Sequence, residues 1–156
     1  MRISGFFTLP HTINPENVTS GYQDGAMAFS LVQIGRVVSP IKNPRKAPKM
    51  ESEGGAVCEI HVDPLYSDAL LNLEPGQEMF LFTWLHLSDR NTLRVHPRGD
   101  ASRPLRGVFN TRSPDRPNPI GLHAVRIQEI KPGPVLVVSP LEAVDGTPVV
   151  DIKPRN

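Results

Sequence analysis

Residues 110–122 read Asn-Thr-Arg-Ser-Pro-Asp-Arg-Pro-Asn-Pro-Ile-Gly-Leu, with prolines at positions 114, 117 and 119. Proline fixes φ at about −65° and has no amide hydrogen to donate, so these positions cannot lie inside a helix or a central strand. Each proline also pushes the residue before it toward extended geometry. The sequence therefore predicts a stiff loop at residues 110–122.

Five polar residues stand on this loop: Arg112, Ser113, Asp115, Arg116 and Asn118. Because the prolines restrict the backbone in advance, these side chains would lose little conformational entropy on binding a ligand. One interpretation is therefore a preorganised binding surface. The other is a proline-rich surface connection without chemistry, because many loops only join elements.

Length and composition predict one all-β domain. A chain of 156 residues buries about 70% of its unfolded surface and can fold without disulfides or metals. Hydrophobic content of 38% with 17 prolines and 12 glycines suits many short strands joined by turns. The single cysteine, Cys58, cannot form an internal disulfide, and no apolar run approaches the roughly 20 residues of a membrane span. With no signal peptide visible, we expect a cytoplasmic protein.

Charge is unevenly distributed along the chain. The net charge is only +1, but residues 35–50 contain five basic residues and no acid, a net +5. Residues 90–131 contain nine basic and three acidic residues, a net +6, so the remainder carries −10. This asymmetry is typical of a protein with one face on a polyphosphate such as RNA. Clustering in sequence does not by itself mean clustering in space, so scattered surface charge is the alternative.

Apolar periodicity predicts strands over residues 31–38, 55–62, 78–87, 120–130, 135–139 and 149–152. A short helix is expected from Asp63 and Pro64, which suit its N-cap and first position. Residues 1–30 show no sustained periodicity and are interpreted as an N-terminal segment of unknown role before a domain at 31–156. The segment 78–87 is almost continuously apolar, which predicts burial on both faces, as a central strand or a dimer-interface strand. Because it is too apolar for one small barrel to cover alone, we expect a homodimer.

Three blocks in the same order carry a resemblance to a known family. They are Ile34 to Pro40, Val108 to Leu122 (Val-Phe-Asn-Thr-Arg-Ser-Pro-Asp-Arg-Pro-Asn-Pro-Ile-Gly-Leu) and Asp145 to Pro154 (Asp-Gly-Thr-Pro-Val-Val-Asp-Ile-Lys-Pro). They closely resemble the signature of the TsaA-like family, whose type members are the TrmO (YaeB) tRNA methyltransferases. The resemblance covers roughly three quarters of the chain.

The resemblance implies a small single-sheet β-barrel with one short helix and long loops, dimerising with its pocket at or near the interface. It implies the cofactor S-adenosyl-L-methionine and methylation of the exocyclic nitrogen of threonylcarbamoyladenosine at tRNA position 37, with the tRNA anticodon stem-loop as partner. The sequence has no glycine-rich loop between a first strand and a helix, so a Rossmann methyltransferase is excluded. Two alternatives remain open: a same-fold methyltransferase for another small molecule or nucleoside, and a non-catalytic module that binds S-adenosylmethionine or RNA.

The resemblance also implies a methyl-donor pocket. Its residues would be Pro48, Lys49, Met50, His86, Leu87, Arg112, Leu122, Ser139, Pro140, Leu141 and Glu142. Among the polar residues near it, His86, Asp115 and Glu142 are candidates for a catalytic base. A guanidinium pairs well with a carboxylate, and both methionine and threonine moieties carry one, so Arg112 is expected to contact donor or substrate.

The arginine-rich segments predict an RNA-facing surface, because guanidinium groups both contact phosphates and stack on bases. Its residues would be Arg45, Lys46, Arg94, Arg98, Arg103, Arg106 and Arg116. The histidines at 61, 86, 96 and 123 fit no zinc-binding spacing, so no metal site is predicted.

Overall fold

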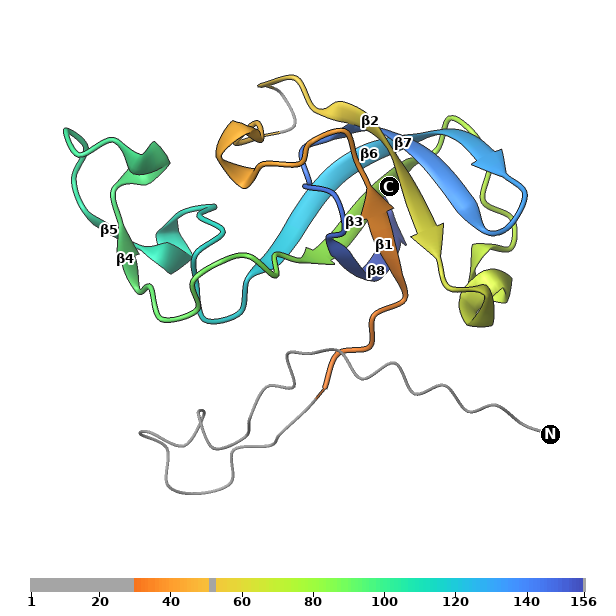
Figure 1. Ribbon diagram of the computed structural model, residues 1–156, viewed down its shortest axis with the longest axis horizontal. Coiled ribbons are helices and arrows are strands. Elements are labelled where there is room, and N and C mark those ends of the chain that lie inside the picture. The colour runs from red at the N-terminus through yellow and green to blue at the C-terminus, as the bar shows by residue number, and fades with distance from the viewer. Residues whose placement is uncertain (1–29, 51–52, 156) are drawn as a thin grey trace. The chain divides into compact units, whose positions relative to one another are not determined.

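The computed structural model describes residues 30–50 and 53–155 (Figure 1). The chain divides into two units, residues 1–31 and 32–156, and the second contains every element described below. The N-terminal segment proposed for residues 1–30 lies almost wholly outside the described residues. The strands are β1 (Gly35–Val38), β2 (Ala56–Val62), β3 (Glu78–Trp84), β4 (Arg94–Val95), β5 (Arg106–Gly107), β6 (Ile120–Lys131), β7 (Val135–Leu141) and β8 (Pro148–Pro154).

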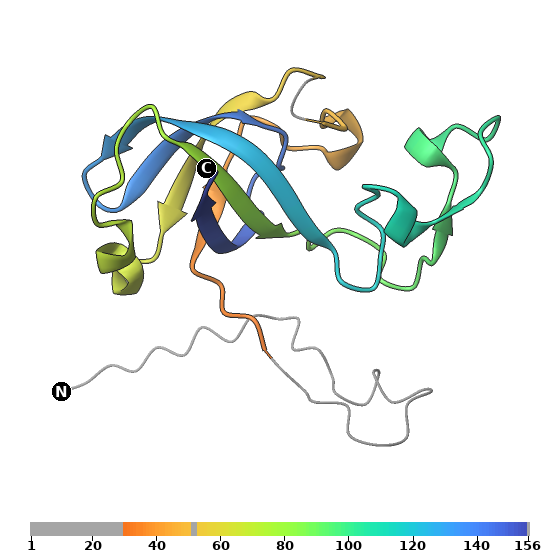
Figure 2. The same ribbon diagram turned by 180° about the vertical axis from the view of Figure 1, so that it is seen from behind.

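Six of these strands form a closed antiparallel barrel in the order β1-β2-β7-β6-β3-β8. Closure pairs both edges of every strand, which removes the free edges that make open sheets prone to aggregate. Figure 2 shows β6 crossing the barrel beside β3, and the register between them places Phe82 opposite Leu122. The expected all-β barrel is confirmed.

Side chains alternate between the inside and outside of the barrel along β3. Met79, Leu81 and Thr83 are at most 3% exposed, whereas Phe80 and Phe82 on the outer face are only partly buried. The expectation of burial on both faces is therefore wrong for the described residues of one chain. The strand is also shorter than predicted, because beyond Trp84 the chain turns away and the Leu85 amide donates to Pro119 O, 2.8 Å away.

The predicted helix after Asp63 is present as 3-10 helix over Pro64–Leu70, with a kink at Tyr66. The Asp63 carboxylate accepts from the Leu65 amide at 2.9 Å, as an N-cap should. A helix this short gains little from α-helical cooperativity, so tighter i→i+3 bonds such as Tyr66 N to Asp63 O (2.8 Å) suffice. No helix among the described residues is long and apolar enough to cross a membrane.

The segment predicted as an arginine-rich loop contains a small second sheet, β4 paired with β5. We call residues 89–110 the arm. Two-residue strands have no periodicity that a sequence could show, which is why they were not predicted. The arm is followed by residues 111–119, which have no regular secondary structure and are called the proline loop. A loop at this position, as expected, is confirmed.

Candidate functional site

The proline loop is held in place by side chains from within it and from the arm. Arg116 donates to three backbone carbonyls, those of Ser113 (2.7 Å), Thr111 (2.6 Å) and Val108 (3.1 Å). The Asp115 carboxylate accepts from the Asp89 amide at 2.9 Å. Arg116 and Asp115, which were expected to contact RNA and to act as a base, therefore hold the backbone of the proline loop and the arm. The sequence did not predict this structural role.

The proline loop meets β6 through Arg112. Its guanidinium donates from Nη2 to the carbonyl of Leu122 at 2.9 Å, which joins two residues expected in the donor pocket. The charge of Arg112 also helps to lower the pKa of Glu142, so these three residues share one neighbourhood. The side chain of Leu122 itself is 44% exposed on the outer face of the barrel.

A buried chain of polar groups lies next to Arg112. His123 is 4% exposed and donates from Nδ1 to Glu142 Oε1 at 2.7 Å, because an ionised carboxylate can only accept. The other ring nitrogen, Nε2, lies 2.9 Å from the hydroxyl of the fully buried Thr83. The contacts at the two ring nitrogens, with Glu142 and with Thr83, together fix the orientation of the imidazole.

Opposing effects act on the Glu142 carboxylate. Burial raises its pKa, but the hydrogen bond and charge of His123, with the charge of Arg112, outweigh burial and leave the pKa below its ordinary value. The second oxygen, Oε2, is buried and has no hydrogen-bond partner among the described residues. A buried carboxylate oxygen of this kind is an acceptor suited to a hydroxyl or ammonium group of a ligand.

Thr83 and His123 were not singled out by sequence reasoning as site residues. A signal was nevertheless present in β6, because His123 is in phase with the core residues Val125 and Ile127 at spacings of two. A polar residue on the buried face of a strand requires a buried partner. Gly121 completes the arrangement, since a Cβ there would lie 2.4 Å from Thr83 Oγ1 and 2.6 Å from His123 Nε2.

The four pocket residues from Ser139 to Glu142 point in different directions. Leu141 is fully buried in the core, whereas Ser139 and Pro140 line a shallow hollow of about 240 Å³ on the outer face of β6 and β7. The other residues lining this hollow are Glu78, Ala124, Val125, Arg126, Gln128 and Arg155. Pockets for small molecules usually measure about 300–1,000 Å³, so this hollow alone is too small to enclose a nucleoside cofactor.

The expected pocket residues Pro48 to Met50 lie against the arm. Lys49 Nζ donates to the carbonyl of Arg98 at 2.5 Å, and Arg98 Nη2 lies 3.7 Å from Met50 Sδ. Arg98 also pairs with Glu53. The loop before β2 and the arm, which are some 50 residues apart in sequence, are thus joined. His86 and Leu87 lie just after the end of β3, where the chain leaves the barrel, and Leu87 is 61% exposed.

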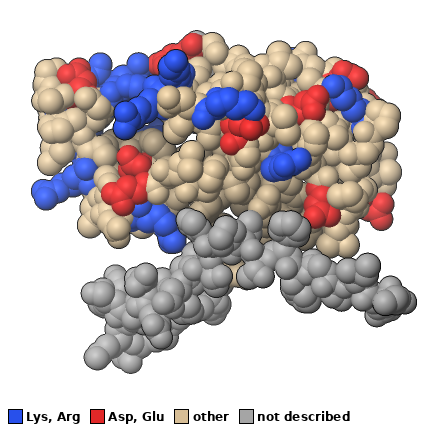
Figure 3. Space-filling model, viewed as in Figure 1, with Lys and Arg blue, Asp and Glu red and all other residues tan. Residues whose placement is uncertain are grey.

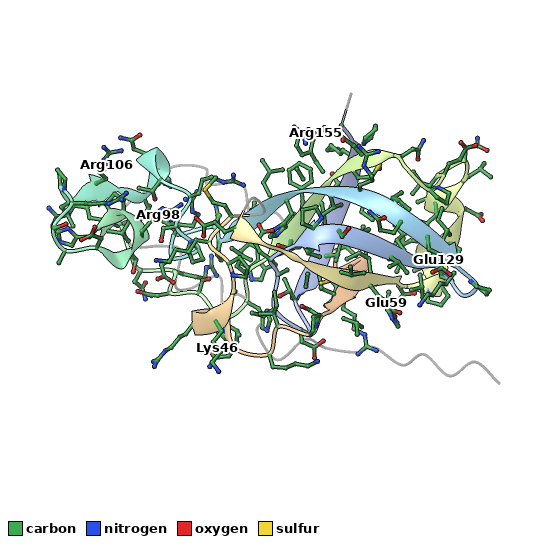
Figure 4. The ribbon with its side chains drawn as sticks, turned by 90° about the horizontal axis from the view of Figure 1, so that it is seen from above. Lys46, Glu59, Arg98, Arg106, Glu129 and Arg155 are labelled. Atoms are coloured by element: carbon green, nitrogen blue, oxygen red, sulfur yellow. The ribbon has the colours of Figure 1, made fainter. Side chains whose placement is uncertain are left out.

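Only part of the two basic segments gathers at one end of residues 32–155, because Arg126 and Lys131 lie elsewhere and pair with Glu78 and Glu59. Figure 3 shows Lys and Arg side chains concentrated where the arm approaches the turn Pro44–Lys46. Figure 4 shows Lys46, Arg98 and Arg106 at this end, with Glu59 and Glu129 at the opposite end. Arg98 and Arg103 are neutralised by Glu53 and Asp100, respectively. No acidic partner pairs with Arg45, Lys46, Arg94 or Arg106 within the described part of the chain.

Comparison with known proteins shows to which family this chain belongs. Residues 36–155 match the model of the tRNA-methyltransferase O N-terminal domain, and this chain belongs to that family. A probable S-adenosyl-L-methionine-binding protein of Methanothermobacter thermautotrophicus is 46% identical over 128 residues, which cover 82% of this chain and 90% of the relative. An S-adenosyl-L-methionine-binding protein of Archaeoglobus fulgidus is 43% identical over 79% of this chain and 86% of its own length.

Two bacterial proteins extend the comparison. The tRNA (adenine(37)-N6)-methyltransferase of Escherichia coli K12 is 36% identical over 138 residues, which cover 81% of this chain and 57% of the enzyme. The crystal structure of TrmO from Pseudomonas aeruginosa aligns with a TM-score of 0.66 at 28% identity, covering 83% of this chain and 57% of that one. This chain therefore spans somewhat more than half the length of these two proteins.

Proposed function

We propose that this protein uses S-adenosyl-L-methionine to methylate the exocyclic nitrogen of threonylcarbamoyladenosine at position 37 of tRNA. The observation that carries the proposal is membership of the tRNA-methyltransferase O family, together with the name of the Escherichia coli relative. The basic end of the described unit supports an RNA substrate, because phosphate contacts dominate the affinity of RNA-binding proteins.

The neighbourhood of Arg112, Leu122 and Glu142 fits the methyl donor chemically. A guanidinium already oriented by the Leu122 carbonyl can pair with the methionine carboxylate of the donor. Oε2 of Glu142, a buried acceptor without a partner among the described residues, suits a ribose hydroxyl or the ammonium group. When bound, the donor would supply a methyl group activated by its sulfonium, so the protein mainly has to position both reactants and exclude water.

Of the three candidates for a base, two are less suited to take a proton. Glu142 has a lowered pKa and is therefore a weak base, better fitted to accept a fixed hydrogen bond. Asp115 already accepts the Asp89 amide and helps to hold the proline loop. We therefore assign proton removal from the carbamoyl-bearing nitrogen to His86, because imidazole is the usual general base near neutral pH.

Methyl transfer by the purified protein tests this proposal. With S-adenosylmethionine and tRNA containing threonylcarbamoyladenosine, we expect nucleoside mass spectrometry to show the methylated base. Arg112→Ala should weaken donor binding about 10- to 100-fold in calorimetry, the usual effect of losing a charged hydrogen bond. Lys131→Ala, which removes a surface pair with Glu59, is the control and should bind normally. Donor binding without methylated tRNA would favour the small-molecule or non-catalytic alternatives.

We also propose that the active form is a homodimer. Three cross-strand pairs place apolar side chains together on the outer face of the barrel: Phe80 with Ala124, Phe82 with Leu122, and Trp84 with Ile120. This patch meets the hollow at Ala124, and the hollow is too small alone. A second chain on the patch would bury the apolar side chains and enclose the ligand.

Light scattering measures the oligomeric state directly. We expect a mass about twice that of the 17.2 kDa chain, because the patch needs a partner. Phe82→Glu should give a monomer, since it places a charge at the centre of the patch. Val57→Glu changes a 62% exposed residue on β2 and should leave the dimer intact. A monomeric wild-type protein at micromolar concentration would contradict the proposal.

A further inference from the structure

Phe109 is the most exposed large hydrophobic side chain in the described part of the chain, at 82%. It lies in the 3-10 turn Val108–Asn110, at the junction of the arm and the proline loop. Phe109 belongs neither to the barrel core nor to the residues expected in the donor pocket. An aromatic ring held in water at this position is therefore a candidate contact for a partner.

The backbone on both sides of Phe109 is firmly held. Val108 is 2% exposed and its amide donates to Leu93 O at 3.0 Å. The Val108 carbonyl accepts from the Thr111 amide at 3.1 Å and from Arg116 Nη2 at 3.1 Å. The ring is thus displayed from a fixed turn, so little backbone entropy would be lost when a partner binds it.

Each strand of the two-stranded sheet that precedes the Phe109 turn carries an arginine, Arg94 on β4 and Arg106 on β5. The register places Arg94 opposite Gly107 and Val95 opposite Arg106, so the two arginines leave opposite faces of the sheet. Neither has an acidic partner among the described residues, and both are exposed. Arg106 is labelled at the far end of the arm in Figure 4. An exposed aromatic ring close in the chain to cations without an acidic partner among the described residues complements a nucleotide, which has an aromatic base and an anionic phosphate.

We propose that Phe109 is a stacking platform for an unpaired RNA base, with Arg94 and Arg106 contacting the phosphates around it. The inference rests on the proposed function and deepens it by naming how the RNA is held. Side chains read RNA mainly in single-stranded loops, where splayed bases stack on aromatic rings. A partner protein on this surface would require a larger apolar patch and acidic side chains opposite the arginines.

The test uses the full-length protein and two RNAs of equal length, a tRNA anticodon stem-loop and a fully paired duplex. Fluorescence anisotropy should show that Phe109→Ala weakens stem-loop binding about 5- to 100-fold, the range for loss of one stacked base, and leaves duplex binding unchanged. Phe109→Leu should resemble Phe109→Ala, whereas Phe109→Tyr should bind like the wild type because it keeps the ring. Leu65→Ala, which alters another exposed apolar residue (79%) outside the arm, is the matched control.

Salt dependence separates stacking from phosphate contacts. Arg106→Ala should lower the slope of log affinity against log salt by about 0.7–0.9, because each phosphate contact releases bound counterions. Phe109→Ala should shift affinity without changing this slope. Stem-loop affinity of Phe109→Ala within twofold of wild type, or wild-type affinity in Phe109→Leu, would overturn the stacking role.

Two further results separate this inference from the proposed function. Light scattering could show that the Phe109→Ala protein is a monomer while the wild type is a dimer. That result would also overturn the stacking role, because it would place the ring in a contact between two chains. If the wild-type protein methylates tRNA while Phe109→Ala binds the stem-loop normally, the inference fails and the proposed function stands. A wild-type protein that neither binds the stem-loop nor methylates tRNA would overturn both.

Discussion

Replacement of Gly121 by alanine is expected to reduce the free energy of unfolding by about 2–4 kcal/mol, which combines overpacking with a strained buried hydrogen bond. The added Cβ would lie 2.4 Å from Thr83 Oγ1 and 2.6 Å from His123 Nε2, closer than non-bonded atoms approach. Both neighbours are buried and hydrogen-bonded to each other, so neither can move without breaking the polar chain to Glu142. Urea unfolding at a fixed protein concentration measures the loss.

Gly107→Ala is the matched control for this substitution. Gly107 has φ −62°, and a Cβ added there would have no atom within 4 Å outside its chain neighbours. Alanine is therefore accommodated at this position, and we expect no loss of stability, or a gain below about 1 kcal/mol from the less flexible unfolded chain. Equal stabilities of the two variants would mean that the space around Gly121 can relax and that the Thr83–His123 contact is not rigid.

The barrel strands and the proline loop could be predicted because their determinants are local. Runs rich in apolar and β-branched residues, bounded by turn residues, define β6 and β7. Three prolines in six residues leave residues 111–119 few conformations. The dipeptide Asp145-Gly146 likewise favours a turn by its local chemistry, and Gly146 has the positive φ of 77° that glycine allows. Strand ends were less predictable, since β3 ends at Trp84 through a bond to the distant Pro119.

The candidate site depends on contacts that no local pattern encodes. Glu142 could be named from the sequence, but its partner His123 lies 19 residues earlier, and Thr83 lies 40 residues before His123. Only closure of the barrel brings the three together. Arg116 illustrates a second limit, because an arginine between prolines has the same sequence signature whether it faces RNA or binds backbone carbonyls. Charge patterns indicate where basic residues are, not which of them are already paired.

The buried hydrogen bond between His123 and Glu142 predicts a large loss of stability when His123 is removed. The two side chains are 5% and 12% exposed, so removing His123 leaves a buried carboxylate without its main partner. We expect His123→Leu to lower the free energy of unfolding by about 3–5 kcal/mol at pH 7.5. The exposed pair His61–Glu59, with side chains 37% and 34% exposed, is the control, and His61→Leu should lower stability by less than about 1 kcal/mol.

The pH dependence follows from the direction of the pKa of Glu142. In the wild type this pKa is lowered from 4.5, so the carboxylate stabilises the fold above that value, and the contribution is lost as pH falls through the lowered pKa. Burial is the largest single influence on this pKa in the wild type, so we expect removal of His123 to raise the pKa of Glu142 above 4.5. The His123→Leu protein should therefore regain stability as pH falls from 7.5 to 5, because Glu142 then takes up a proton.

A double substitution isolates the contribution of Glu142 from any titration of His123 itself. In the wild type, Glu142→Gln should destabilise, because it removes the charge that His123 and Arg112 favour. In the His123→Leu background the same substitution should stabilise by about 1–2 kcal/mol at pH 7.5, because it removes an unpaired buried charge. That gain should shrink as the pH falls toward 5, because a raised pKa lets Glu142 take up a proton in the single variant. A Glu142→Gln effect of the same sign in both backgrounds would show that the carboxylate does not depend on His123.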